Sequence, residues 1–199
     1  PLESVELKFL SAKTALLTAL TSIKRVEDLQ AFSVSEECLV FRPAYSDVVL
    51  RPWPGYVPKV PTTPFRDQMV NLQALPPEEA DPTLALLCLV RSYTWTAPRA
   101  SEALLSSLYG GQQKGKAVSK QRLAHCIMDA MVLTYQSQDE PCPLGVRAHS
   151  TRSVASSYAL AHGASLADIC RAAGWATPNT FARFYSLRVE PVSSRVLGN

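Results

Sequence analysis

Apolar residues at helical spacing form the first element of the chain. They recur every three or four residues and predict a helix from about Val5 to Ser22 with one buried face. A second amphipathic segment follows Arg25, and we expect a short helix there. The apolar stripe of the first helix consists of Leu7, Leu10, Leu17 and Leu20, with Leu16 widening it.

The next segment is rich in β-forming residues. Two short apolar runs, Cys38–Phe41 and Asp47–Leu50, are separated by Pro43 to Ser46, so the pattern predicts a hairpin or meander. Residues 53–64 contain too many prolines for a helix or a central strand. We expect an extended connection or a third, edge strand in this stretch.

The middle of the chain alternates loops with short elements. An acidic, proline-rich loop is expected at residues 76–82 and a helix at 83–94. Another loop is expected at 98–102. Residues 104–109 fit either a strand or a short segment that Gly110 and Gly111 stop, before a basic turn at 112–116.

Helix start and stop signals organise the C-terminal half. Ser119 is a suitable N-cap for a helix whose inner stripe runs from Leu123 to Tyr135. A second helix is expected over Ser150–Ala161, ended by Gly163.

Three more elements complete the pattern. Ser165 and Asp168 have the spacing of a capping box, and Gly174 ends the helix that follows. The pair at 177–178 combines an N-cap with a proline at the first helical position, so another helix begins there and carries Tyr185. A last short helix is expected over residues 193–197.

Composition indicates a folded chain that is compatible with a polyanionic partner. The 199 residues are 47% hydrophobic and carry a formal net charge of +3. No segment has the pattern of a membrane span or a signal peptide. The five cysteines form no CxxC pair and the three histidines are scattered, which favours reduced thiols in an intracellular protein and no zinc site. Because the chain begins at Pro1, we expect it to be a fragment.

Four chemically active residues follow one another in the last quarter of the chain. His149 and Arg152 lie three apart at the start of a helix, Trp175 follows Gly174, and Tyr185 comes ten residues later. Each one alone fits an ordinary core or surface position. Together they supply a general acid/base, a phosphate-binding cation, an indole N–H donor and a hydroxyl nucleophile, a set suited to metal-free attack on a phosphodiester.

The order and spacing of these residues resemble the C-terminal motifs of the tyrosine recombinases, the phage-integrase family. The segment around Arg25 and Asp28 is similar to the first arginine box of that family. The resemblance implies that Arg25, His149, Arg152, Trp175 and Tyr185 are catalytic, with Asp28 orienting Arg25. The box departs from the usual pattern at Ser22 and Lys24.

The family also has a catalytic lysine at a turn of a small sheet. The hairpin turn at residues 44–47 contains no lysine, and the nearest one is Lys59 in the proline-rich connection. A lysine can release a proton near neutral pH and an arginine cannot. Lys59 is therefore the candidate, although a surface lysine on an extended segment explains it equally well.

Further basic residues are candidates for contacts with the phosphates of the DNA backbone. Those in the turn at 112–116 fit a solvated loop equally well. The candidate DNA-binding residues are Lys24, Arg42, Lys114, Lys116, Lys120, Arg122 and Arg147.

The resemblance covers nearly the whole chain and implies an α+β, mostly α-helical catalytic domain with a small antiparallel β-sheet after the second helix. It implies that residues 1–199 form this domain, without an N-terminal core-binding domain, and that a tail at 186–199 is exchanged between subunits of a dimer to tetramer on double-stranded DNA. No cofactor or membrane is expected.

In detail, a set of short motifs looks most like recombinases of DIRS and Ngaro-type retrotransposons. The motifs are residues 24–29, 49–52, 57–60, 119–123, 146–152, 174–176 and 184–185. This resemblance implies a DNA-integrating enzyme of the nucleus. The alternatives are type IB topoisomerase-like DNA relaxation and an inactive, recombinase-derived DNA-binding protein.

Overall fold

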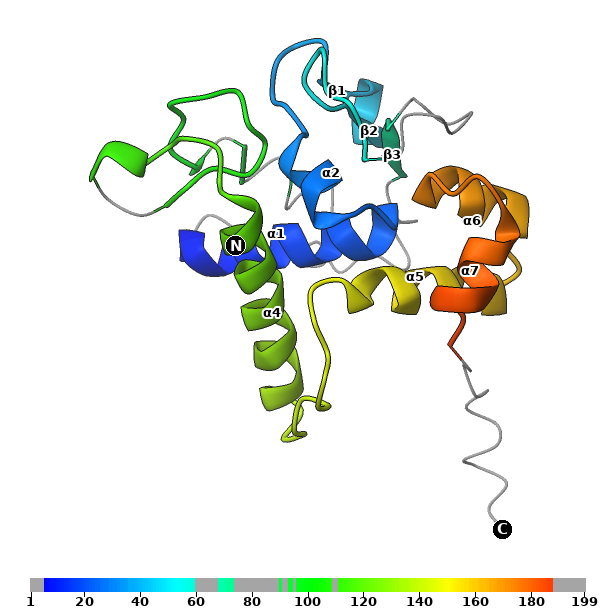
Figure 1. Cartoon of the computed structure of the whole chain (residues 1–199). Coiled ribbons are helices and arrows are strands. Elements are labelled where there is room, and N and C mark those ends of the chain that lie inside the picture. The colour runs from blue at the N-terminus through cyan, green and yellow to red at the C-terminus, as the bar shows by residue number, and fades with distance from the viewer. Residues whose placement is uncertain are drawn as a thin grey trace.

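A computed structural model describes residues 6–59, 68–73, 90, 93–94, 96–108 and 111–187 of the chain. These residues are mostly α-helical and include a small antiparallel sheet, so the predicted fold class is confirmed (Figure 1). The helices are α1 (Leu7–Ser22), α2 (Val26–Gln30), α4 (Lys120–Gln136), α5 (Ser150–Ala161), α6 (Leu166–Ala173) and α7 (Pro178–Phe184). The strands are β1 (Leu39–Phe41), β2 (Asp47–Leu50) and β3 (Val70–Gln73), and short 3-10 turns occur at η2 (Pro43–Tyr45) and η3 (Gly111–Gln113).

Helix α1 lies at the centre of the molecule. The sheet lies on one side of it and α4 and α5 on the other (Figure 1). Its buried residues join the inner side chains of the sheet and of α4 in one apolar cluster that includes Leu10, Leu50, Leu72, Leu123 and Ile127. This packing fixes α5, which carries His149 at its start, relative to the turn that carries Arg25.

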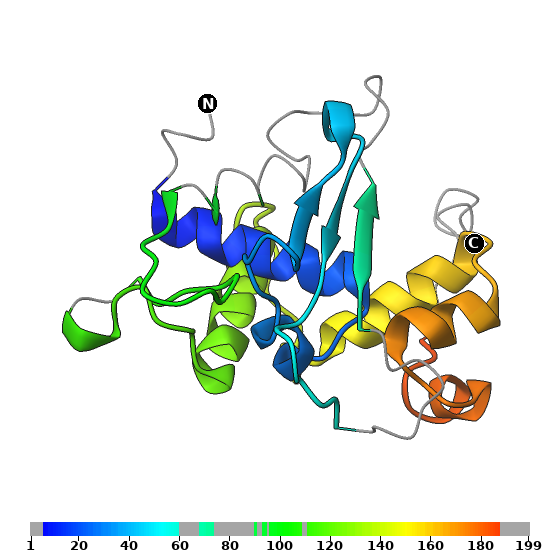
Figure 2. The same cartoon turned by 90° about the horizontal axis from the view of Figure 1, so that it is seen from above.

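The three strands form an antiparallel sheet in the order β1-β2-β3, and the strands cross over α1 (Figure 2). Val48 pairs with Leu72 and Leu50 pairs with Val70, and all four side chains are buried. Alternate positions of β3 are exposed, as expected of a strand with one face on the core. The buried face of the sheet thus packs against the core.

A second, smaller apolar cluster positions α6 and α7. It comprises Ile169, Cys170, Ala173, Trp175 and Phe181 with Ile23 from the end of α1, and Tyr185 packs against it. None of the described helices combines the length and apolar composition needed to cross a membrane.

The predicted helix boundaries agree with the structure where capping signals are strong. Ser119 accepts a hydrogen bond from the Arg122 N–H at 3.2 Å, and Ser165 accepts one from the Asp168 N–H at 3.1 Å. Gly174 ends α6 with a φ of 68°, a left-handed conformation that favours glycine.

The stretch at 53–64 was expected to be an extended connection or an edge strand, and its residues 60–64 lie outside the described residues. Residues 53–59 contain no strand, and β3 lies further along, at Val70–Gln73. Residues 104–108 contain only an isolated bridge between Ser106 and Ala117 rather than a strand. The predicted acidic loop at 76–82, most of the helix at 83–94, and the last helix at 193–197 lie outside the described residues.

Candidate active site

Tyr185 and His149 come together although 36 residues separate them. The Tyr185 hydroxyl lies 3.1 Å from Nε2 of His149, and their ring centroids are 5.5 Å apart. His149 is the residue directly before α5, and Tyr185 directly follows α7. A neutral imidazole with its proton on Nδ1 can accept the tyrosine proton at this distance.

Arg152 lies against the Tyr185 ring and is fully buried. Its Nη2 donates a 2.8 Å hydrogen bond to the Ala173 carbonyl at the end of α6. Its guanidinium carbon is 5.0 Å from the Trp175 ring centroid and 5.4 Å from that of Tyr185. Burial, and then the positive charge of Arg25, lower the Arg152 pKa to about 10, so the group is still charged at neutral pH.

Three buried donors in this region have no acceptor among the described protein groups. They are Nε and Nη1 of Arg152 and Nε1 of Trp175. Buried donors without partners are costly, so each one needs an explanation. The arrangement suits an anion that would accept from these groups beside the Tyr185 hydroxyl.

Trp175 supports both Arg152 and Tyr185. Its ring is 2% exposed, and its centroid is 4.6 Å from that of Tyr185, with 32° between the planes. It follows Gly174, whose left-handed conformation turns the chain from α6 toward α7. The indole therefore forms a wall of the site and also presents a donor.

Ser157 fixes the backbone around Tyr185. The Ser157 hydroxyl donates a 3.0 Å hydrogen bond to the Tyr185 carbonyl and accepts one of 2.8 Å from the Leu187 N–H. Ser157 is buried on α5, the helix that also carries Arg152. The two bonds attach the chain on both sides of Ser186 to this helix.

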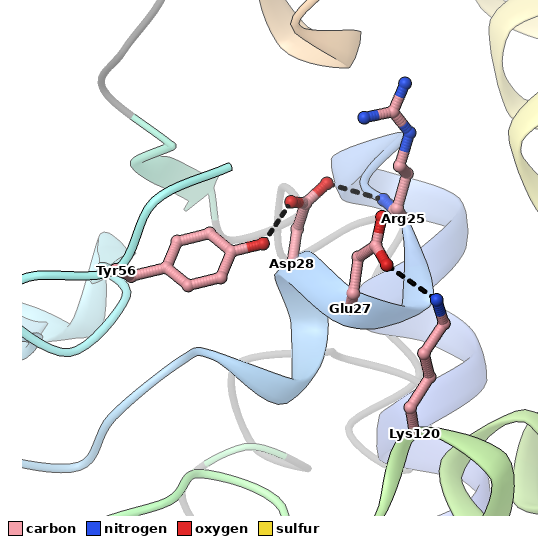
Figure 3. A network of polar contacts seen from close by, with 5 residues as sticks. All are labelled: Arg25, Glu27, Asp28, Tyr56 and Lys120. Atoms are coloured by element: carbon pink, nitrogen blue, oxygen red, sulfur yellow. Dashed lines mark hydrogen bonds and ion pairs between the residues drawn. The ribbon is translucent and has the colours of Figure 1, made fainter. Parts of the chain in front are cut away.

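Arg25 approaches from the turn between α1 and α2. Its backbone N–H donates to Oδ2 of Asp28 at 3.0 Å, and Oδ1 of Asp28 accepts from the Tyr56 hydroxyl at 2.7 Å (Figure 3). The Arg25 guanidinium points away from this carboxylate (Figure 3). Asp28 thus holds the backbone of Arg25 instead of its side chain, which differs from the orienting contact expected from the sequence.

Burial and nearby positive charges both favour the neutral form of His149. Burial lowers the pKa of the His149 imidazole below its usual value, and the charges of Arg152 and Arg25 lower it further. A neutral imidazole beside a tyrosine hydroxyl is the form that accepts a proton. Arg25 and Arg152 also repel each other, so an anion placed between them would relieve this repulsion.

An open cleft of about 690 Å³ leads to these residues. Arg25, His149 and Tyr185 line it, and so does Lys59, which lies on the connection between β2 and β3. The cleft also contains Lys120 and Arg147, and Lys120 forms a 2.6 Å ion pair with Glu27 (Figure 3). Apart from Glu27, its charged lining is basic, which suits a polyanion.

Comparison with solved structures identifies the architecture. The structure of XerA recombinase superposes with a TM-score of 0.56 at 14% sequence identity, over 96% of this chain and 58% of that chain. XerH site-specific recombinase, bound to its difH substrate in a pre-cleavage complex, gives 0.57 at 14% identity, over 96% and 50%. The Tn1549 transposon integrase, in complex with a circular intermediate DNA, gives 0.55 at 12% identity, over 92% and 56%.

The fold is that of a tyrosine recombinase catalytic domain. The chain spans between 50% and 58% of the length of these three solved chains. No protein-family profile and no curated protein sequence matches it.

The recombinase fold brings all six residues predicted to be catalytic to one place. Arg25, Lys59, His149 and Tyr185 line the cleft, and Arg152 and Trp175 lie buried against Tyr185.

Six of the seven predicted DNA-binding residues lie at the surface, in three places. Lys120 and Arg147 line the cleft, whereas Arg122 lines a separate groove between α1 and α4. Exposed residues elsewhere on the surface are Arg42, 3.9 Å from Asp47, and Lys114 and Lys116 after η3.

Lys24 contradicts the prediction of a surface contact to DNA. It is only 3% exposed, and its Nζ donates a 3.1 Å hydrogen bond to Oε1 of Gln68. Ile23 ends α1 with a left-handed φ of 56°, and this turn directs Lys24 inward and Arg25 toward the cleft. Lys24 is therefore a structural residue beside the arginine turn.

Two residues with direct contacts to the site were not predicted. Tyr56 binds Asp28, and Ser157 binds the backbone around Tyr185. Ser157 had no distinguishing signal in a helix rich in alanine and serine. Tyr56 lies three residues before Lys59, and that proximity was the only available signal.

Proposed function

We propose that this chain is the catalytic domain of a DNA recombinase that cleaves and rejoins strands through a covalent phosphotyrosine at Tyr185. The observation that carries the proposal is the buried Arg152 with unpaired Nε and Nη1, adjacent to a tyrosine hydroxyl that His149 contacts at 3.1 Å. A scissile phosphate would satisfy these donors.

The negative charge that develops on phosphorus needs fixed cations and donors. Arg25 and Arg152 bind the two non-bridging oxygens, and Trp175 donates its indole N–H. A planar guanidinium suits two-point binding of phosphate better than an ammonium group does. Loss of one such donor raises the barrier by about 3 kcal/mol, roughly a 100-fold slower reaction.

The covalent step keeps the number of phosphodiester bonds constant, because one bond forms as another breaks. The Tyr185 oxygen forms a bond to phosphorus, its proton moves to Nε2 of His149, and the bond from phosphorus to the 5′-oxygen breaks. The products are a 3′-phosphotyrosine and a 5′-hydroxyl. A 5′-hydroxyl from another strand reverses the step without a cofactor or ATP.

The departing 5′-oxygen needs a proton, and Lys59 supplies it. Two lysines line the cleft, Lys59 and Lys120, and Lys120 forms an ion pair with Glu27. Lys59 has no ion pair among the described residues and lines the cleft with Tyr185. Its ammonium gives up one proton and is restored from solvent.

The biological setting is a further part of the proposal. Sequence motifs around Arg25, Lys59, Arg122 and Arg147 support an enzyme of a DIRS- or Ngaro-type retrotransposon that integrates a DNA copy in the nucleus. Double-stranded DNA is the partner, and the solved relatives XerH and Tn1549 integrase are DNA complexes. Subunits assemble on the DNA through the tail at 186–199.

A covalent-capture experiment tests the proposal without a known target sequence. The chain, with any residues that precede Pro1 in its gene, is mixed with duplexes that carry a randomised window and a fixed nick. Cleavage near the nick releases a short fragment and traps the protein on DNA. We expect adducts that survive denaturing gels and whose recovered DNA shares a sequence.

The Tyr185→Phe variant is the matched control, because it removes one oxygen and keeps the ring. It should bind DNA and form no adduct. Binding by both proteins without an adduct from either would contradict the proposal and favour a DNA-binding protein without activity. Relaxation of a supercoiled plasmid without strand exchange would instead favour a topoisomerase.

A further inference from the structure

Tyr56 connects two parts of the active site that are far apart in the sequence. It lies on the connection between β2 and β3, and its hydroxyl donates a 2.7 Å hydrogen bond to Oδ1 of Asp28 (Figure 3). The other oxygen of that carboxylate accepts the backbone N–H of Arg25 at 3.0 Å. One carboxylate thus holds the Arg25 turn and the Tyr56 segment together.

The Asp28 end of this contact is buried. Asp28 is 3% exposed, so its two acceptor positions are in a protected environment where hydrogen bonds to a charged group are strong. Burial, together with the hydrogen bond to the Asp28 carboxylate, raises the pKa of Tyr56. The phenol therefore stays protonated and keeps donating across the working pH range.

The segment that carries Tyr56 is also held at its start. The Trp53 N–H donates to the Ala31 carbonyl at 2.9 Å, and the Tyr56 N–H donates to the Trp53 carbonyl at 3.1 Å. Gly55, with a φ of 91°, makes the turn between them. The Tyr56 ring meets the Trp53 ring edge-on at 6.0 Å. These contacts define where the ring of Tyr56 lies.

Lys59 follows Tyr56 by three residues and lines the cleft with Arg25, His149 and Tyr185. Three residues span at most about 11 Å, so the Tyr56 contact limits how far the Lys59 backbone can move from the site. The long side chain of lysine has many rotamers, and an unattached connection would add backbone freedom to them. Fixing the chain three residues earlier reduces that freedom.

We propose that Tyr56 is a positioning residue that holds Lys59 where it can protonate the departing 5′-oxygen. This inference rests on the proposed function. In the step concerned, Tyr185 forms its bond to phosphorus, the bond from phosphorus to the 5′-oxygen breaks, and that oxygen takes a proton from the Lys59 ammonium. Tyr56 touches none of the reacting atoms and acts through the chain that carries Lys59.

A change of leaving group separates this role from a general structural one. A 5′-bridging phosphorothiolate substrate releases a thiol, whose pKa of about 8.5 is far below that of an alcohol, so its departure needs no proton donor. The substrate is made from a sequence recovered by covalent capture. A variant that damages only the proton donor is slow on the oxygen substrate and normal on the sulfur substrate.

The Tyr56→Phe variant keeps the ring and loses the hydrogen bond to Asp28. We expect it to form the adduct about 10-fold or more slowly on the oxygen substrate and within about twofold of wild type on the sulfur substrate. Lys59→Ala should show the same pattern with a larger defect, on the order of 100-fold.

Tyr93→Phe is the matched control, because the buried Tyr93 hydroxyl bonds to the Ser106 backbone in the main core. It loses both hydrogen bonds to Ser106, and its ratio of oxygen to sulfur rates should equal that of wild type. Melting temperatures of all variants show whether each one is folded.

Equal defects of Tyr56→Phe on both substrates would overturn the inference, because Tyr56 would then act through Arg25 or through folding. A wild-type rate of Tyr56→Phe on the oxygen substrate would overturn it too. So would a Lys59→Ala variant that is as slow on the sulfur substrate as on the oxygen substrate. The absence of any adduct from the wild-type chain on either substrate would instead mean failure of the proposed function itself.

Discussion

Nε2 of His149 lies 3.1 Å from the hydroxyl oxygen of Tyr185. The contact depends on packing between the start of α5 and the end of α7, and it pairs a proton acceptor with a hydroxyl nucleophile. Whether this contact can transfer a proton depends on the protonation state of His149, because only a neutral imidazole can take the tyrosine proton.

The first prediction concerns the titration of His149. Burial and the charges of Arg152 and Arg25 lower its pKa below 6.5, so the imidazole stays neutral to a more acidic pH than an exposed histidine does. Cleavage by the free enzyme should therefore decline only below about pH 6.5, as pH falls through the lowered pKa. NMR titration of the imidazole measures the pKa directly.

Two arginine substitutions test whether nearby charge contributes to the lowered pKa of His149. Arg152→Gln removes a nearby positive charge, and the His149 pKa should rise toward its ordinary value. Arg171→Gln removes an exposed arginine that pairs with Asp168 on α6, and the titration should not move. A His149 pKa above 6.5 in the wild-type chain would contradict this account.

The second prediction is that Arg152 lowers the stability of the folded protein although covalent adduct formation requires it. Its guanidinium is fully buried, and no carboxylate among the described residues forms a salt bridge with it. Arg152→Met retains much of the apolar volume and removes the buried charge, so the melting temperature should be unchanged or higher. Adduct formation should fall by about 100-fold or more. A clear loss of stability would show that Arg152 is chiefly structural.

The third prediction concerns Ser157, whose hydroxyl holds the backbone on both sides of Ser186. Ser157→Ala should slow adduct formation by about 10-fold, because a small displacement of the nucleophile is costly, and leave DNA affinity unchanged. Ser156→Ala is the control, since the buried Ser156 hydroxyl bonds only to carbonyls within α5. Equal rates for the two variants would count against a positioning role.

The fourth prediction separates Lys24 from the basic residues of the cleft. Arg147 lines the cleft, so Arg147→Ala should reduce the salt dependence of DNA binding by about one phosphate contact. Lys24 is buried against Gln68, so Lys24→Met should leave that slope unchanged. Binding isotherms at several salt concentrations measure both slopes. An equal drop for Lys24→Met would place that lysine on the DNA.

Local signals explain which elements could be predicted from sequence. Ser119, Ser165 and Gly174 cap helices through contacts within a few residues, so their boundaries followed from the sequence. The strand Val70–Gln73 has only four residues, and it is a strand because Val48 and Leu50 pair with it. No pattern inside four residues specifies such a partner.

The difference between local signals and long-range contacts also explains which site residues could be predicted. His149, Arg152, Trp175 and Tyr185 were found because their order resembles a known set of motifs. The Tyr56 contact to Asp28 spans 28 residues, and the left-handed turn at Ile23 that buries Lys24 is a tertiary effect. Contacts of this kind depend on packing, so spacing along the chain could not predict them.

The identity of the residue joined to DNA tests the central claim most directly. Trypsin would cut the captured adduct after Arg183 and Arg188, which gives a peptide of residues 184–188 with Tyr185 as its only tyrosine. Mass spectrometry should find a nucleotide attached to this peptide through the phenolic oxygen. A nucleotide attached to any other residue, or an adduct that persists in Tyr185→Phe, would contradict the account.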